Sequence, residues 1–97
     1  MFGLIAKLTI IPGKREEMIG ILTDSASGMP GCFSYTVAED AADANVLWVT
    51  EVWESEAAHD ASLSLPAVRD AIPRARLMVT GFEKVAATRP VWGVPGR

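Results

Sequence analysis

The sequence has one cysteine, one histidine and one tyrosine, and these low counts exclude several kinds of site. A single cysteine, Cys32, cannot form a disulfide within one chain and cannot build a cysteine-based zinc site there. A single histidine, His59, excludes a metal site with two histidine ligands from one chain, although a dimer would bring two His59 side chains together. We therefore expect no metal site within a single chain.

Basic residues and long apolar runs are also scarce. There are 9 Lys and Arg against 12 Asp and Glu, which gives a net charge of −3, and the densest basic stretch is only Arg69, Arg74 and Arg76. Because nucleic-acid binding relies on clustered cations, we expect no nucleic-acid partner. No apolar run approaches the ~20 residues of a membrane span, so we expect no membrane partner. The apolar start contains Lys7 and lacks a basic n-region. It therefore predicts a strand rather than a signal peptide, in a cytoplasmic protein.

The hydrophobic period predicts the order β-α-β-β-α-β within one domain. Strands are expected at residues 2–11, 31–39, 46–53 and 81–88, and the first helix at 14–27. Ser55 is a suitable N-cap for a short helix from Glu56 to about Leu63. A further helix begins near Pro66, and Pro73 inside its pattern predicts a kink or a break. This order predicts an α+β, ferredoxin-like fold, an antiparallel sheet with helices on one face.

The predicted domain spans residues 1–88, and residues 89–97 form a tail rich in proline and glycine, with Trp92 as its one large anchor. Two of the predicted strands are apolar on both faces. In residues 46–53, one face carries Leu47, Val49, Glu51 and Trp53, and the other carries Val46, Trp48, Thr50 and Val52. Helices cover only one face of such a sheet, and soluble monomers rarely expose a large apolar patch. We therefore expect a homodimer in which two sheets face each other.

Two short motifs resemble those of a known family. The motif Glu51-x-Trp53-x-Ser55-x-x-Ala58 ends a strand and opens a helix, and Pro12-Gly13-Lys14 closes the first strand. Both are similar to the antibiotic biosynthesis monooxygenase family, and the resemblance covers roughly residues 2–88. It implies that the subunits pair sheet to sheet as a dimeric α+β barrel. It also implies oxygenation of a small quinol or aromatic polyphenol by O2 without metal or flavin, so we expect no cofactor and a small aromatic ligand.

Such chemistry needs a dry apolar pocket, a group that favours the phenolate and room for oxygen. The candidate catalytic residues are His59, the side chain most apt to titrate near neutral pH, and Tyr35, which can hydrogen-bond a ligand oxygen. The candidate substrate-binding residues are Trp53 as an aromatic wall, Ser62 as a hydrogen-bond donor, and Glu51, which burial would make a base.

Each candidate also has a purely structural interpretation, which for Ser62 is that of a small packing residue. Trp53 suits a core position with its N–H bonded to backbone, and Tyr35 suits a half-buried strand with its hydroxyl in solvent. Glu51 on an apolar strand favours an ion pair with Lys7 or with an arginine of a partner chain. His59 lies about 100° from the inner face of its helix, which favours a partly exposed position on the helix flank.

Other functions remain open at the level of sequence. A non-catalytic dimeric module that binds a small molecule is one alternative, and an isomerase of a small carbonyl compound is another. If Glu51, His59 and Tyr35 all pointed outward, catalysis would lack a base. Haem-degrading relatives use asparagine, tryptophan and an axial histidine at positions that correspond here to Ala6, Ser62 and Ile72. Since Ile72 cannot ligate iron, we expect no haem degradation.

Overall fold

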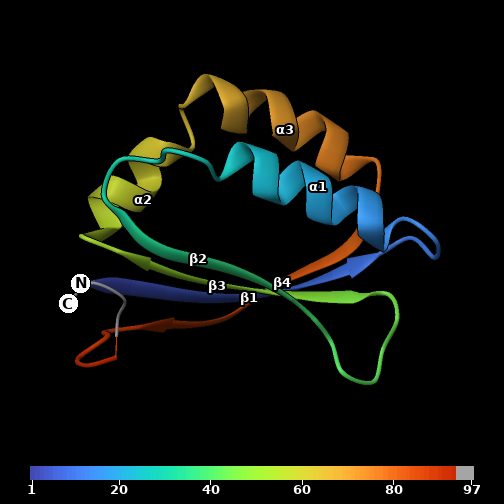
Figure 1. Cartoon of the computed structure of the whole chain (residues 1–97), viewed down its shortest axis with the longest axis horizontal. Coiled ribbons are helices and arrows are strands. Elements are labelled where there is room, and N and C mark those ends of the chain that lie inside the picture. The colour runs from blue at the N-terminus through green and yellow to red at the C-terminus, as the bar shows by residue number, and fades with distance from the viewer. Residues whose placement is uncertain (94–97) are drawn as a thin grey trace.

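The computed structural model describes residues 1–93, which form a four-stranded antiparallel sheet with three helices on one face (Figure 1). The strands are β1 (Phe2–Ile10), β2 (Cys32–Glu39), β3 (Val46–Trp53) and β4 (Val79–Thr88). The helices are α1 (Arg15–Ser25), α2 (Glu56–Ser62) and α3 (Pro66–Arg76). The sheet order is β2-β3-β1-β4, so the two most apolar strands lie at the centre. The predicted ferredoxin-like α+β fold is confirmed.

Local sequence signals explain where the elements begin and end. β1 is followed by a turn in which Gly13 has a φ of 85°, a value that favours glycine. The predicted N-cap of α2 is confirmed, because Ser55 Oγ accepts a hydrogen bond of 3.1 Å from the backbone N–H of Ala58. These two turns place α1 and α2 on the same face of the sheet (Figure 1).

Of the kink or break predicted at Pro73, the break does not occur. α3 continues through Pro73 to Arg76, and only then do backbone hydrogen bonds from Leu77 and Met78 close the helix. Pro73 deprives the carbonyl of Arg69 of its usual N–H donor, but both residues are exposed, so water can replace that bond. α3 ends at Arg76, and Val79 begins β4.

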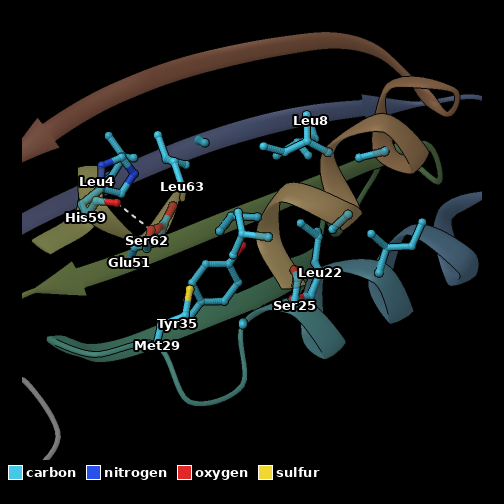
Figure 2. A pocket seen from close by; sticks show the side chains of 18 of the residues that line it. Leu4, Leu8, Leu22, Ser25, Met29, Tyr35, Glu51, His59, Ser62 and Leu63 are labelled. Atoms are coloured by element: carbon cyan, nitrogen blue, oxygen red, sulfur yellow. Dashed lines mark hydrogen bonds between the residues drawn. The ribbon is translucent and has the colours of Figure 1, made fainter. Parts of the chain in front are cut away.

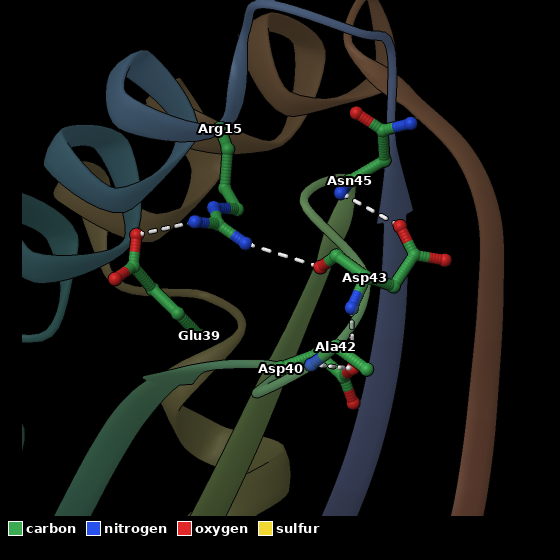
Figure 3. Close-up of polar contacts among 6 residues, drawn as sticks. All are labelled: Arg15, Glu39, Asp40, Ala42, Asp43 and Asn45. Carbon is green, nitrogen blue, oxygen red and sulfur yellow. Dashed lines mark hydrogen bonds and ion pairs between the residues drawn. The ribbon is translucent and has the colours of Figure 1, made fainter.

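The loop between β2 and β3 is fixed to the start of α1 (Figure 3). Arg15 pairs with Glu39 at 2.8 Å and donates a hydrogen bond of 3.1 Å to the carbonyl of Asp43. Within the loop, one carboxylate oxygen of Asp40 accepts backbone hydrogen bonds from Ala42 and Asp43. Its other oxygen accepts the indole N–H of Trp48 at 2.8 Å. The bond from Trp48, followed by those from the loop amides, lowers the pKa of Asp40 to about 2.

Strand alternation separates a face covered by helices from an open face. On the helix side, Leu4, Ala6 and Leu8 of β1 lie opposite Glu51, Val49 and Leu47 of β3. These strands pack against Met18 and Ile21 of α1 and Ala71 of α3, which completes the core. The alternation predicted for residues 46–53 is therefore confirmed, and the helix side of β3 carries Glu51 and Trp53.

No element of the described chain covers the opposite side of the sheet, which we call the open face (Figure 1). By strand register it carries Ile5 and Lys7 of β1 with Thr50 and Trp48 of β3, and Lys7 lies 5.8 Å from the Trp48 ring centroid. Thr88 follows on β4, beside Gly3. A Cβ on Gly3 would collide with the Thr88 hydroxyl, so a larger residue there would have to displace that side chain.

The large side chain of the predicted tail is exposed in the single chain. Trp92 is 92% exposed, so it anchors nothing within the described chain. The end of the predicted tail, residues 94–97, lies outside the described residues. Within residues 1–93, no helix combines the length and apolar character needed to cross a membrane.

Candidate functional site

A cavity of about 360 Å³ lies between the helix side of the sheet and the three helices (Figure 2). This volume falls in the lower part of the range for small-molecule sites. Most of its wall is hydrocarbon, contributed by the central strands and by all three helices. The apolar lining includes Leu4, Ala6, Leu8, Ile21, Leu22, Val49, Val68, Ala71 and Ile72. Such a wall favours an aromatic or otherwise apolar ligand.

All five side chains proposed from the sequence line this one cavity. Tyr35 comes from β2, Glu51 and Trp53 come from β3, and His59 and Ser62 come from α2. Figure 2 shows Tyr35, Glu51, Ser62 and His59 along one side of the cavity. Residues from three separate elements therefore converge at the end of the cavity closed by α2.

Glu51 is the buried acid of the cavity. It is 9% exposed, and its Oε1 accepts a hydrogen bond of 2.9 Å from the indole Nε1 of fully buried Trp53. Burial raises the pKa of Glu51, while the Trp53 hydrogen bond and the charge of His59 act in the opposite direction. The expected pairing with Lys7 was wrong, because strand alternation places Lys7 on the open face. The expected backbone partner for Trp53 was also wrong, since its partner is the Glu51 carboxylate.

The second oxygen of Glu51 accepts no hydrogen bond from residues 1–93. A carboxylate with one oxygen held by Trp53 and the other free has a fixed orientation and a remaining acceptor site. Its raised pKa brings it closer to neutral pH, where it is a better proton acceptor than an ordinary surface glutamate.

His59 lies against the same tryptophan. Its ring centroid is 5.5 Å from that of Trp53, in an edge-to-face arrangement, and 5.8 Å from that of Phe2. Its side chain is only 17% exposed, and its Nδ1 lies 3.1 Å from Oδ1 of Asp60. His59 is therefore partly exposed, as helix geometry predicted, and it also forms part of the cavity wall.

Ser62 is buried and donates a hydrogen bond of 2.6 Å to the backbone carbonyl of His59 (Figure 2). Its hydroxyl thus closes the last turn of α2. Tyr35 is the register partner of Glu51 on β2. Burial, then the charges of Glu51 and Cys32, strongly raise the pKa of Tyr35, so the phenol stays protonated and can donate a hydrogen bond.

The sequence reasoning missed the contribution of β4 to this cavity. Phe82 and Lys84 are register partners of Leu8 and Ala6, so they stand on the helix side and line the cavity. A shift in register between Ile5 and Ala6 reverses the alternation of β4 at Val85. Side chains alternate between the two faces along β4 as far as this bulge. That alternation in the sequence could have placed Phe82 and Lys84 on the helix side.

The positions that correspond to the haem-degrading site also line the cavity. Ala6, Ser62 and Ile72 are all in its wall, but alanine and isoleucine offer only hydrocarbon. Among residues 1–93, no group of three or more His, Cys, Asp or Glu side chains is placed to hold a metal ion.

Comparison with known proteins gives the family. The family model for antibiotic biosynthesis monooxygenases matches residues 1–74. A provisionally named antibiotic biosynthesis monooxygenase from Chloroflexus aurantiacus is 48% identical, with a TM-score of 0.91 over 95% of this chain and 94% of that one. A similarly named protein from Bacteroides thetaiotaomicron is 19% identical, with a TM-score of 0.85 over 99% and 95% of the two chains, and shows the same fold. No functionally curated protein shows significant similarity. The chain belongs to the antibiotic biosynthesis monooxygenase family.

Proposed function

We propose that the protein is a cofactor-independent monooxygenase that oxidises a small quinol or aromatic polyphenol with O2 in this cavity. The observation that carries the proposal is the buried carboxylate of Glu51, with a raised pKa, in an otherwise apolar cavity. The family name is consistent with such chemistry, since both the matching model and the Chloroflexus relative are named as monooxygenases.

The reaction begins with proton transfer. The free oxygen of Glu51 takes a proton from a hydroxyl of the bound quinol, and the resulting phenolate is far more easily oxidised than the neutral phenol. Tyr35 stays protonated and donates a hydrogen bond to a ligand oxygen. The edge of Trp53 and the ring of His59 hold the aromatic ring beside the carboxylate.

Oxygen then reacts with the phenolate. The phenolate transfers one electron to O2, and the semiquinone and superoxide combine to form a carbon–oxygen bond at a ring C–H position. Glu51 returns its proton to the distal oxygen of the peroxide, the O–O bond breaks, and that oxygen leaves as water with a second hydrogen from the substrate. The substrate gains one oxygen and loses two hydrogens, and it supplies all the electrons. No external reductant is required.

The test is oxygen uptake by metal-stripped protein with dihydroxynaphthalenes and anthrols. Wild-type protein is expected to consume O2 above the autoxidation blank and to place labelled oxygen in the product. Glu51→Gln is expected to lose at least about tenfold in rate, as removal of a general base commonly costs more than that. Glu54→Gln, an exposed glutamate three residues along the chain, is the matched control. Uptake that is unchanged in Glu51→Gln contradicts the assigned base.

The same groups favour one alternative reaction. A buried carboxylate beside a protonated Tyr35 also suits isomerisation of a small carbonyl compound, in which a base removes a proton next to the carbonyl. Exchange of substrate hydrogen with solvent deuterium, without oxygen uptake, would identify it. Ligand binding with neither reaction would assign the protein as a non-catalytic binding module.

We also propose that the working unit is a homodimer joined through the open face. The support is the composition of that face, where Ile5 and Trp48 stand beside the exposed Thr50 in the middle of the sheet. A second copy presents the same surface and would cover it with two-fold symmetry.

A further inference from the structure

Lys84 stands at the rim of the cavity. It lies on the helix side of β4, opposite Ala6, and it is exposed because no helix covers this edge of the sheet. Phe82, two residues earlier on the same face, is 65% exposed, and Leu63, which also lines the cavity, is 48% exposed. These three residues mark where the cavity opens. Within residues 1–93, Lys84 forms no ion pair.

The cavity therefore has opposite charges at two separate places. Glu51 on β3 is opposite Leu4, whereas Lys84 on β4 is opposite Ala6, so the two lie on either side of β1 and two residues apart along it. With ordinary strand spacing, their Cα atoms are roughly 12 Å apart. Between them the wall is hydrocarbon, including Leu4, Ala6 and Val49. No other lysine or arginine lines this cavity in the described chain.

We propose that Lys84 selects quinols and phenols that carry an anionic substituent, such as a carboxylate, remote from the reacting hydroxyl. This inference rests on the proposed oxygenation, because that reaction fixes the hydroxyl at Glu51. A negative group beside Glu51 would be buried next to a like charge, which is unfavourable. The same group beside Lys84 is partly solvated and meets an opposite charge. The two side chains together orient the ring with its neutral hydroxyl inward and its anion at the rim.

The test compares two ligands of similar size that differ in charge. One is a dihydroxynaphthalene with a carboxylate on the ring remote from its hydroxyls, and the other is the corresponding neutral carboxamide. Their affinities are measured by calorimetry without oxygen for wild type, Lys84→Gln, Lys84→Arg and Lys14→Gln. Lys14 is an exposed lysine before α1, so its replacement changes the net charge equally but away from the cavity. Circular dichroism verifies that each variant is folded.

The carboxylate is expected to bind wild type about three-fold or more tightly than the carboxamide, as a partly exposed ion pair permits. The preference should vanish in Lys84→Gln, persist in Lys84→Arg and Lys14→Gln, and weaken as salt is raised. An equal preference in wild type and Lys84→Gln, or no binding of either ligand, would overturn the proposal.

Oxygen uptake with the same two ligands separates this inference from the proposed function. Uptake with both ligands and no dependence on Lys84 keeps the oxygenase and overturns the role of Lys84. A preference that depends on Lys84, without any uptake, keeps the binding role and rejects the oxygenase.

Discussion

The indole Nε1 of Trp53 donates a hydrogen bond to Oε1 of Glu51, two residues earlier on the same strand and 2.9 Å away. Residues two apart on a strand share a face, so the donor and the acid are built into one short motif. The bond fixes the orientation of the carboxylate and favours its charged form, against the effect of burial. Trp53 is thus both a wall of the cavity and a partner of its acid.

Replacing Trp53 by phenylalanine should shift the pH dependence of the reaction. Without the indole N–H, the charged form of Glu51 loses its donor, so the pKa of Glu51 rises further. The midpoint of the rise of kcat/KM with pH should move to higher pH, because the base must be ionised. Trp48→Phe is the control, since Trp48 bonds to Asp40 away from this cavity. If the midpoint shifts equally in Trp53→Phe and Trp48→Phe, Glu51 is not the base that the pH profile reports.

Glu51 should also make stability depend on pH. Its pKa is raised in the folded protein, so between the unfolded and folded pKa values the folded state binds more protons. Its contribution to the free energy of unfolding therefore falls as pH rises through that window. Glu51→Gln should lack this decrease, so its stability relative to wild type should increase with pH. Urea unfolding at a series of pH values measures the difference; a constant difference across the series would show that Glu51 does not titrate there.

Three glycine-to-alanine variants should change the free energy of unfolding by amounts that differ in sign and size. Gly31 has a φ of 77°, and a Cβ there would lie 2.9 Å from the Cβ of Ala58 in α2. Gly28 has a φ of 72° but open space around it. Gly28→Ala should cost about 1–2 kcal/mol from backbone strain alone, and Gly31→Ala should cost more, because α2 must also move. Gly20→Ala, inside α1 with open space, should stabilise by about 0.5–1 kcal/mol. Thermal unfolding gives the order, and equal losses for Gly28→Ala and Gly31→Ala would contradict the close contact.

A charge at the centre of the open face should separate the proposed dimer. Thr50 is exposed and lies between Ile5 and Thr36 across the sheet. Thr50→Glu would bury two like charges against each other in a two-fold interface. Light scattering should give about twice the single-chain mass of 10.4 kDa for wild type and the single-chain mass for the variant. Thr23→Glu, on the exposed side of α1, makes the same chemical change and should remain dimeric.

Much of the site was predictable because strands alternate with a period of two. That period places Glu51 and Trp53 together on the helix side, and the Ser55 cap places α2, with His59, directly after them. The partner of Glu51 was not predictable in the same way. Lys7 is of opposite charge, but its odd position on β1 places it on the other face, and side-chain hydrogen bonds are not encoded by periodicity.

The position of Lys84 on the helix side of β4 was hard to predict for a different physical reason, because alternation holds only as far as an irregularity in the strand. A bulge at Val85 changes which residues of β4 face the helices, and bulges have no reliable sequence signal. Pro73 is the opposite case, because the rule that proline ends a helix does not hold there. The helix continues because the missing hydrogen bond to the carbonyl of Arg69 lies on an exposed surface.

The cavity and the open face are two sides of the same pair of strands. Thr50 adjoins Glu51 in sequence, and Ile5 adjoins Leu4, so one backbone carries both surfaces. Suppose that two copies pair through the open face and that a ligand in the cavity strengthens this pairing by some factor. The ligand must then bind the dimer more tightly than the single chain by the same factor. The apparent affinity of the cavity would then depend on the concentration of the protein as well as on the chemistry of the ligand.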